Sequence, residues 1–177
     1  MAQNCQIPLQ VLDVDAVTHP VIAGLCDYWC ALADGTPPAR AQFDFMRIYK
    51  VAPHLLMAER VEPGTFKFIY CGTTVADNFP RDLTGATYGP TTPRVSRIDW
   101  PVFFGEVLDQ PCLRYGRERI DWPNAEYKDI IYAACPLVGK DGRPSYVVAC
   151  LVFVPRSPFD PHDIQGGWSP GGLSTLR

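Results

Sequence analysis

Residues 127–154 read YKDIIYAACPLVGKDGRPSYVVACLVFV and contain two apolar runs, 127–137 and 145–154, joined by Lys140-Asp141-Gly142-Arg143. An Asp-Gly turn between two apolar runs is a strong signal for a tight β-hairpin. The second run is apolar at odd and even positions alike, which is typical of a strand that is covered on both faces. We therefore expect residues 145–154 to form a central strand.

A second hairpin is predicted earlier in the chain. Residues 54–61 and 66–71 have the composition of strands, and the intervening Glu62-Pro63-Gly64-Thr65 has Pro and Gly at the central positions of a turn. One further strand is expected at 113–120. These patterns predict an α+β fold with a five-stranded antiparallel sheet, in which the two hairpins lie side by side.

Helices are expected at three places. Residues 18–34 carry apolar side chains at helical spacing and end at Asp34-Gly35. A short helix is predicted after Asp44, and a longer one from Trp100, where Phe103, Phe104, Val107 and Leu108 continue the apolar stripe. We expect the helices to pack mainly on one face of the sheet.

The domain organisation follows from these elements. Residues 1–17 are predicted to be an N-terminal arm, and residues 18–154 a single domain whose core begins near residue 43. Residues 155–177 are rich in Pro, Gly and Ser with little to bury, so a flexible tail is expected there.

Composition argues against several classes of function. The net charge is −3 and the basic residues are scattered, so we expect no nucleic-acid partner. The longest apolar run, Tyr146–Val154, is far shorter than the roughly 20 residues of a membrane-spanning helix, so no membrane partner is expected. The first twenty residues do not resemble a signal peptide, and the 7 cysteines are dispersed and odd in number. Reduced thiols and a cytoplasmic location are the expectation.

Catalytic and metal chemistry finds little support in the sequence. The 3 histidines, His19, His54 and His162, lie far apart along the chain, and neither a nucleophile elbow nor a glycine-rich phosphate loop is present. Asn4-Cys5-Gln6 precedes every predicted core element, so it does not match a photoactive flavin site. We predict no catalytic site and no metal site, find no flavin or heme signature, and leave the cofactor unknown.

Several short motifs occur in an order and spacing that resemble a known family. They are Tyr28-Trp29, Pro38-Ala39-Arg40, Pro53-His54-Leu55, Phe68-Ile69-Tyr70-Cys71-Gly72-Thr73, Arg81-Asp82-Leu83-Thr84-Gly85, Cys135-Pro136-Leu137 and Asp141-Gly142. Over about residues 25–154 the chain resembles the PAS-like proteins of alphaproteobacteria, often described only as PAS domains of unknown function. The resemblance implies a PAS fold and a stand-alone sensory or regulatory role.

In a PAS fold the long helix lies over the sheet, so its aromatic stripe would meet the aromatic residues of the second strand. The expected ligand-binding residues for a small apolar or aromatic ligand are His54, Phe68, Tyr70, Trp100, Phe104 and Tyr132. The same aromatic residues also fit a solid core, which is the interpretation we favour over a pocket with Tyr70, Tyr132 and Cys135 as its polar groups. For His54, the alternative to a ligand role is a ring that bonds to backbone groups.

Two partner expectations and two alternative functions complete the interpretation. We find no output domain in the sequence, so a signalling partner protein is expected. The apolar stripe of residues 18–34 predicts a symmetric homodimer, unless the chain's own sheet covers it. One alternative is a small cone-shaped α+β enzyme acting on an apolar substrate, with a buried carboxylate at Asp77, Asp82 or Asp129. The other is a ligand-free interaction scaffold.

Overall fold

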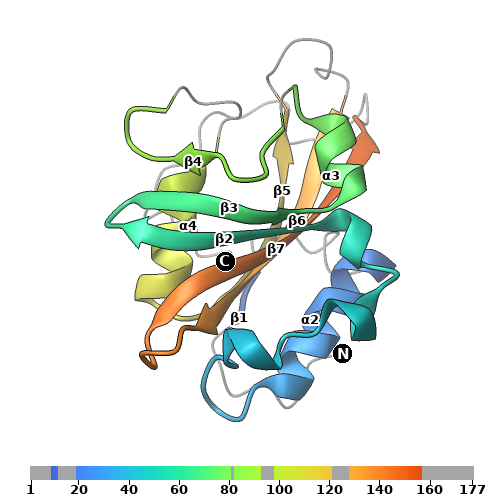
Figure 1. Ribbon diagram of the computed structural model, residues 1–177. Helices are drawn as coiled ribbons and strands as arrows, with labels where there is room; N and C mark the ends of the chain where they lie inside the picture. Colours follow the sequence, from blue (N-terminus) through green and yellow to red (C-terminus); the bar gives the residue numbers. More distant parts are fainter. Residues whose placement is uncertain (1–8, 12–18, 81, 93–97, 121–127, 157–177) are drawn as a thin grey trace, which may run out of the picture.

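The structure is a computed structural model that describes residues 9–11, 19–80, 82–92, 98–120 and 128–156. Most of the predicted N-terminal arm, the tail beyond residue 156 and Arg81 lie outside the described residues, together with Cys5 and His162. The fold is α+β, as expected, and its elements can be followed in Figure 1.

Seven strands form one sheet in the order β1-β5-β6-β7-β2-β3-β4. Their bounds are β1 Leu9–Val11, β2 Leu55–Glu62, β3 Thr65–Cys71, β4 Thr87–Tyr88, β5 Leu113–Arg119, β6 Lys128–Val138 and β7 Pro144–Pro155. The strand expected in the middle, β7, lies between β6 and β2 and is antiparallel to both. Because β7 is paired along both of its edges, its predicted central position is confirmed.

The expected number of five strands is wrong. The two short strands at the sheet edges account for the difference: β1 pairs with β5 in parallel, and β4 pairs with β3 antiparallel. Strand β1 lies within the predicted N-terminal arm, and β4 lies in a turn-rich stretch. Strands of three and two residues carry no readable alternation, so the sequence pattern did not reveal them.

In the described part of the chain, three α-helices and three short 3₁₀ helices surround the sheet. Their bounds are α2 Pro20–Leu32, α3 Thr73–Asn78, α4 Trp100–Asp109, η1 Arg40–Gln42, η2 Phe45–Ile48 and η3 Ala52–His54. The two longest are α2 and α4, which match the predicted helices, and η2 begins after Asp44, whose carboxylate accepts from Met46 N at 2.9 Å.

The helices cover both faces of the sheet, so the expectation that they pack mainly on one face is wrong. Alternate residues of β6 separate into two cores: Tyr132 and Ala134 face α4, whereas Ile131 and Ala133 face α2. Strand β7 divides in the same way. Because both strands are apolar on each side, a helix layer on only one face would leave a large apolar surface in water.

Helix α2 is covered by the chain's own sheet. Ile22, Leu25 and Trp29 are fully buried in the core that α2 forms with β6 and β7. The indole N–H of Trp29 donates to the carbonyl oxygen of Pro136 at 2.8 Å, which ties the helix to β6. The apolar stripe that led us to expect a homodimer through residues 18–34 is therefore already occupied.

Among the described residues, no helix is long and apolar enough to cross a membrane. Four of the 6 cysteines within this part of the chain are buried: Cys26, Cys112, Cys135 and Cys150. A buried cysteine packs as a small apolar side chain.

Gly72 marks a close approach between β3 and η3. Its N–H donates to the carbonyl oxygen of Leu55 at 2.7 Å. A Cβ at this position would lie 2.3 Å from the carbonyl oxygen of Pro53 and 2.4 Å from that of Ala52. Both obstacles are backbone atoms, so rotating a side chain cannot relieve them.

We predict that Gly72→Ala lowers the free energy of unfolding by about 3 kcal/mol, the upper end of the cost of overpacking. Gly105→Ala is the matched control, because a Cβ on Gly105 would have nothing within 4 Å. In this helix interior the control should raise stability by up to about 1 kcal/mol. Urea unfolding of both variants tests the contact, and equal effects would contradict it.

Candidate functional site

An aromatic cluster forms where α4 lies on the sheet. Asp99 caps the helix by accepting from Val102 N at 3.4 Å, and the helical spacing then turns Trp100, Phe103 and Phe104 toward the strands. The ring centroids of Phe104 and Phe66 are 5.5 Å apart, and those of Trp100 and Tyr132 are 5.8 Å apart. Both pairs meet edge to face, the arrangement that aromatic quadrupoles favour.

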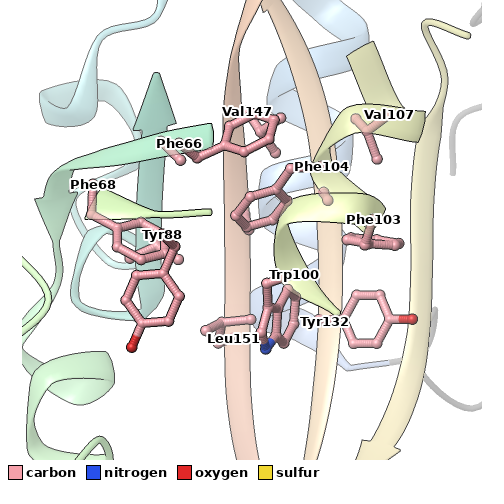
Figure 2. Packing of buried hydrophobic residues seen from close by; sticks show 14 of the residues in the cluster. Phe66, Phe68, Tyr88, Trp100, Phe103, Phe104, Val107, Tyr132, Val147 and Leu151 are labelled. Carbon is pink, nitrogen blue, oxygen red and sulfur yellow. The ribbon is translucent and has the colours of Figure 1, made fainter. Parts of the chain in front are cut away.

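Four of the six expected site residues meet in this cluster. Phe68, Trp100, Phe104 and Tyr132 all belong to the core on the α4 face. Figure 2 shows Trp100 between Leu151 and Tyr132, with Phe104 next to it and Phe68 further along the sheet.

Tyr70 lies on the opposite face of the sheet, so its expected position beside Phe68 is wrong. A β-bulge explains the difference: Met57 pairs with Tyr70 and Ala58 with Phe68, which leaves Ile69 as an extra residue. Strict alternation would place residues 68 and 70 on one face, but the bulge reverses the face after residue 69. The Tyr70 hydroxyl donates to the carbonyl oxygen of Ala52 at 3.1 Å.

His54 also lies apart from the aromatic cluster. Its Nδ1 is 3.3 Å from the carbonyl oxygen of Leu151, and a proton on this nitrogen donates to that oxygen. This backbone contact is the alternative that the sequence analysis set against a ligand role. In the neighbourhood of His54, His19 caps α2 by accepting from Val21 N at 3.3 Å.

A small cavity remains within the aromatic core. Its volume is about 10 Å³, and its walls are apolar: Leu56, Phe68, Phe79, Leu83, Tyr88, Trp100 and Leu151. This volume is about the smallest that can hold one water molecule. Two of the expected site residues, Phe68 and Trp100, line it, whereas Phe104 and Tyr132 support the wall from behind.

The other wall residues were not predicted. Leu151 comes from β7, whose two apolar faces hide which side chains point to a cavity. Phe79, Leu83 and Tyr88 come from turns and from the two-residue strand β4, where no periodicity marks a buried face. Only the packing of these turns against the sheet shows their role.

The indole nitrogen of Trp100 is a buried polar atom beside this apolar wall. Trp100 is 6% exposed, and its Nε1 is buried with no hydrogen-bond partner among the described residues. Trp29, in the opposite core, satisfies the same group with a carbonyl oxygen at 2.8 Å. A buried donor without a partner costs about 1–3 kcal/mol, so the Trp100 N–H is a group that needs an explanation.

The carboxylates considered for an enzyme lie elsewhere. Asp77 and Asp82 are exposed. Asp129 is 5% exposed, and its carboxylate forms ion pairs with Arg117 at 2.8 Å and Arg156 at 3.2 Å. Within the described part of the chain, no group of three or more His, Cys, Asp or Glu side chains is arranged to hold a metal ion.

Two of the thiols, those of Cys71 and Cys150, are poor nucleophiles. Burial, assisted by the negative charge of Asp82, raises the pKa of Cys71 to about 11. Burial also raises the pKa of Cys150, which packs in the α2 core near Cys26. Both side chains therefore stay protonated at neutral pH, and the thiolate is the reactive form.

Comparison with known proteins adds little. No protein-family model matches the chain, and no curated protein matches it. Among solved structures it is similar to an IcIR transcriptional regulator from Alicyclobacillus acidocaldarius, at 13% identity and a TM-score of 0.33. The similarity covers 62% of this chain and 55% of the regulator. A likeness this weak supports no inference about function.

We predict that Phe104→Ala lowers the free energy of unfolding by about 3–5 kcal/mol, because the ring is 1% exposed and packs against four aromatic neighbours. Val102→Ala on the same helix is the control, since Val102 is 47% exposed and should change stability by less than about 0.5 kcal/mol. Denaturant melts measure the change in the free energy of unfolding for both variants. A loss below 1 kcal/mol for Phe104→Ala would contradict the packing described.

The cap on α2 predicts a pH dependence. Burial, and then the proximity of His54, lowers the pKa of His19, so folding favours its neutral form. Protonation would remove the acceptor for Val21 N and place a positive charge at a helix N-terminus. The stabilisation is present above the ordinary histidine pKa of about 6.5 and is lost as the pH falls through the lower, folded value.

Unfolding free energies measured between pH 8 and pH 5 should therefore fall more steeply for the wild type than for His19→Asn. Asparagine caps helices well and does not titrate in this range. Equal slopes for the two proteins would show that His19 does not titrate on folding.

Proposed function

We propose that this chain is a PAS-type sensory or regulatory module. Its ligand is a small apolar or aromatic molecule that carries one hydrogen-bond acceptor and binds beside Trp100. The contiguous strand order β5-β6-β7-β2-β3, antiparallel throughout, supports the PAS-type assignment. The two edge strands, β1 and β4, extend that arrangement without interrupting it.

The unpartnered Trp100 N–H carries the ligand proposal. A single water molecule is a poor partner, because a buried water needs two to four polar contacts and the cavity walls are otherwise apolar. A ligand with an apolar body and one carbonyl, ether or hydroxyl oxygen satisfies the donor and leaves no polar group of its own unpaired. Most ligand sites combine apolar walls with a few such directing groups.

The cavity has to enlarge when a ligand of several heavy atoms binds. Four of its walls belong to regular secondary structure: α4 and strands β2, β3 and β7. Phe79, Leu83 and Tyr88 belong to the segment 79–88, in whose described residues, 79–80 and 82–88, the short strand β4 is the regular element. We propose that ligand binding displaces this segment from the sheet, and that a signalling partner detects the change on the surface.

The second candidate is a ligand-free interaction module. The small volume of the cavity, about 10 Å³, favours it, because a core packed this tightly needs no ligand to complete it. The two candidates differ in one measurable respect: only a sensor should distinguish molecules of the same shape by the presence of an acceptor atom.

A pair of probes with nearly the same shape makes this test. Acetophenone carries a carbonyl acceptor, and isopropylbenzene replaces that oxygen with a methyl group. We expect acetophenone at about ten times its Kd to raise the free energy of unfolding by about 1.4 kcal/mol, and isopropylbenzene to raise it clearly less. In Trp100→Phe the two probes should have equal effects, because the donor is absent.

Trp29→Phe is the matched control. It removes a fully buried indole N–H that already has a partner, so it should lower stability and keep the preference for acetophenone. Equal responses of the wild type to both probes, or no response to either, would contradict the ligand proposal and leave the interaction module as the function.

A further inference from the structure

A second concave region lies on the outer side of α4, away from the aromatic core. It is an open groove of about 600 Å³ between the tip of the β2–β3 hairpin, residues 60–64, and the helix residues 101–109. In Figure 1 this hairpin and α4 lie side by side at the same edge of the molecule. We call this region the hairpin groove.

The walls of the hairpin groove expose apolar side chains. Val61 on the hairpin and Val102 on α4 are each 47% exposed, and Pro63 and Pro101 continue the two walls. Val61 and Val102 are two of the five large apolar residues that the described surface exposes most. Their meeting in one concave region, instead of on scattered convex patches, is typical of an interaction site.

Gly105 forms part of the helix wall. Glycine in a helix interior costs about 1 kcal/mol relative to alanine. Here neither of the usual reasons for glycine applies: its φ is not positive, and a Cβ would have nothing within 4 Å. What the missing side chain does provide is space in the groove, where the backbone of another chain can approach closely.

Arg60 connects the hairpin to α4 along this groove. Its guanidinium donates to Asp109 Oδ1 at 2.8 Å and to the carbonyl oxygen of Gly105 at 3.0 Å, and it lies 5.7 Å from the centre of the Phe66 ring. The third nitrogen, Nε, is buried and has no partner among the described residues. The two hydrogen bonds to Asp109 and Gly105 hold the hairpin against the helix along the groove.

The charges of the groove favour a basic partner. Three carboxylates line it, Glu62, Glu106 and Asp109, against the single guanidinium of Arg60. Arg60 pairs with Asp109, and Arg114 pairs with Glu106 from behind the helix, whereas Glu62 forms no ion pair in the described part of the chain. The C-terminal end of α4 also lies here, and the negative end of the helix dipole attracts positive charge.

We propose that the hairpin groove binds a basic segment of a partner protein. An apolar side chain of that segment lies between Val61 and Val102, and its backbone passes over Gly105. A Lys or Arg of the segment pairs with Glu62. The groove is too open to enclose a small molecule, which a typical ligand site buries almost completely.

This proposal stands on other residues than the ligand proposal, but one element connects the two. Helix α4 presents Trp100 to the cavity, and Gly105 and Asp109 to the groove. A displacement of α4 by a ligand would change the width of the groove. Partner binding itself needs no ligand, so the two proposals can fail separately.

Selection from a random-peptide library displayed on phage tests the partner chemistry. The wild-type protein and Gly105→Leu are used as parallel targets; the leucine fills the groove and suits a helix better than glycine does. We expect peptides that are enriched on the wild type alone to carry net positive charge and a large apolar residue. Enrichment of the same peptides on both targets, of acidic peptides, or of none would overturn the proposal.

Affinities of the best peptide, measured by fluorescence anisotropy, locate the contact. Gly105→Leu should weaken binding at least about tenfold, or 1.4 kcal/mol. Glu62→Lys should weaken it several-fold, whereas Asp34→Lys, with the same change in net charge at an exposed site beyond α2, should leave it within about twofold. Equal losses in the two lysine variants would show non-specific charge attraction and overturn the proposal.

Sedimentation of the wild type and of Gly105→Leu tests whether a second copy of the chain occupies the groove. A wild-type dimer that this substitution dissociates would mean that a second copy of the chain fills the groove. That result would also overturn the proposal of a basic partner segment. We expect both proteins to sediment alike.

Discussion

The double-sided burial of the β6–β7 hairpin is the constraint on which the rest of the structure depends. Alternate residues of these strands enter two separate cores, so each face needs its own cover. Helix α2 and the 3₁₀ helices cover one face, and α4 with the segment 79–88 covers the other. Leaving either face open would expose a continuous apolar surface to water, which is why neither layer is dispensable.

The two cores differ in the hydrogen bonding of a buried tryptophan. On the α2 face, Trp29 donates to Pro136 and fastens the helix to β6. On the α4 face, Trp100 has a similar degree of burial and no acceptor. A protein core normally satisfies such a donor, because an orphaned one costs about as much as a good hydrogen bond contributes. This asymmetry is the reason that the proposed ligand site lies on the α4 side of the sheet and not on the α2 side.

Helix α4 takes part in both proposed activities because its two sides differ in chemistry. Its inner side is aromatic and closely packed, while its outer side combines exposed valine, glycine and carboxylates. At the groove, Arg60 joins the β2–β3 hairpin to the helix through hydrogen bonds to Asp109 and Gly105. A movement of α4 caused by a change in the inner, aromatic core would therefore also move the residues that line the hairpin groove, because both sets lie on one ten-residue helix.

The sequence by itself determined the α+β class, the central position of β7, helices α2 and α4, and the aromatic content of the α4 core. These features depend on local periodicity and on turn residues, which a single chain displays directly. The tertiary structure alone decided the rest. The bulge at Ile69 moved Tyr70 to the other face, because one inserted residue reverses all later alternation. The cavity walls at Phe79, Leu83 and Tyr88, and the groove around Gly105, arise only when segments distant in sequence pack together, and no local pattern encodes that contact.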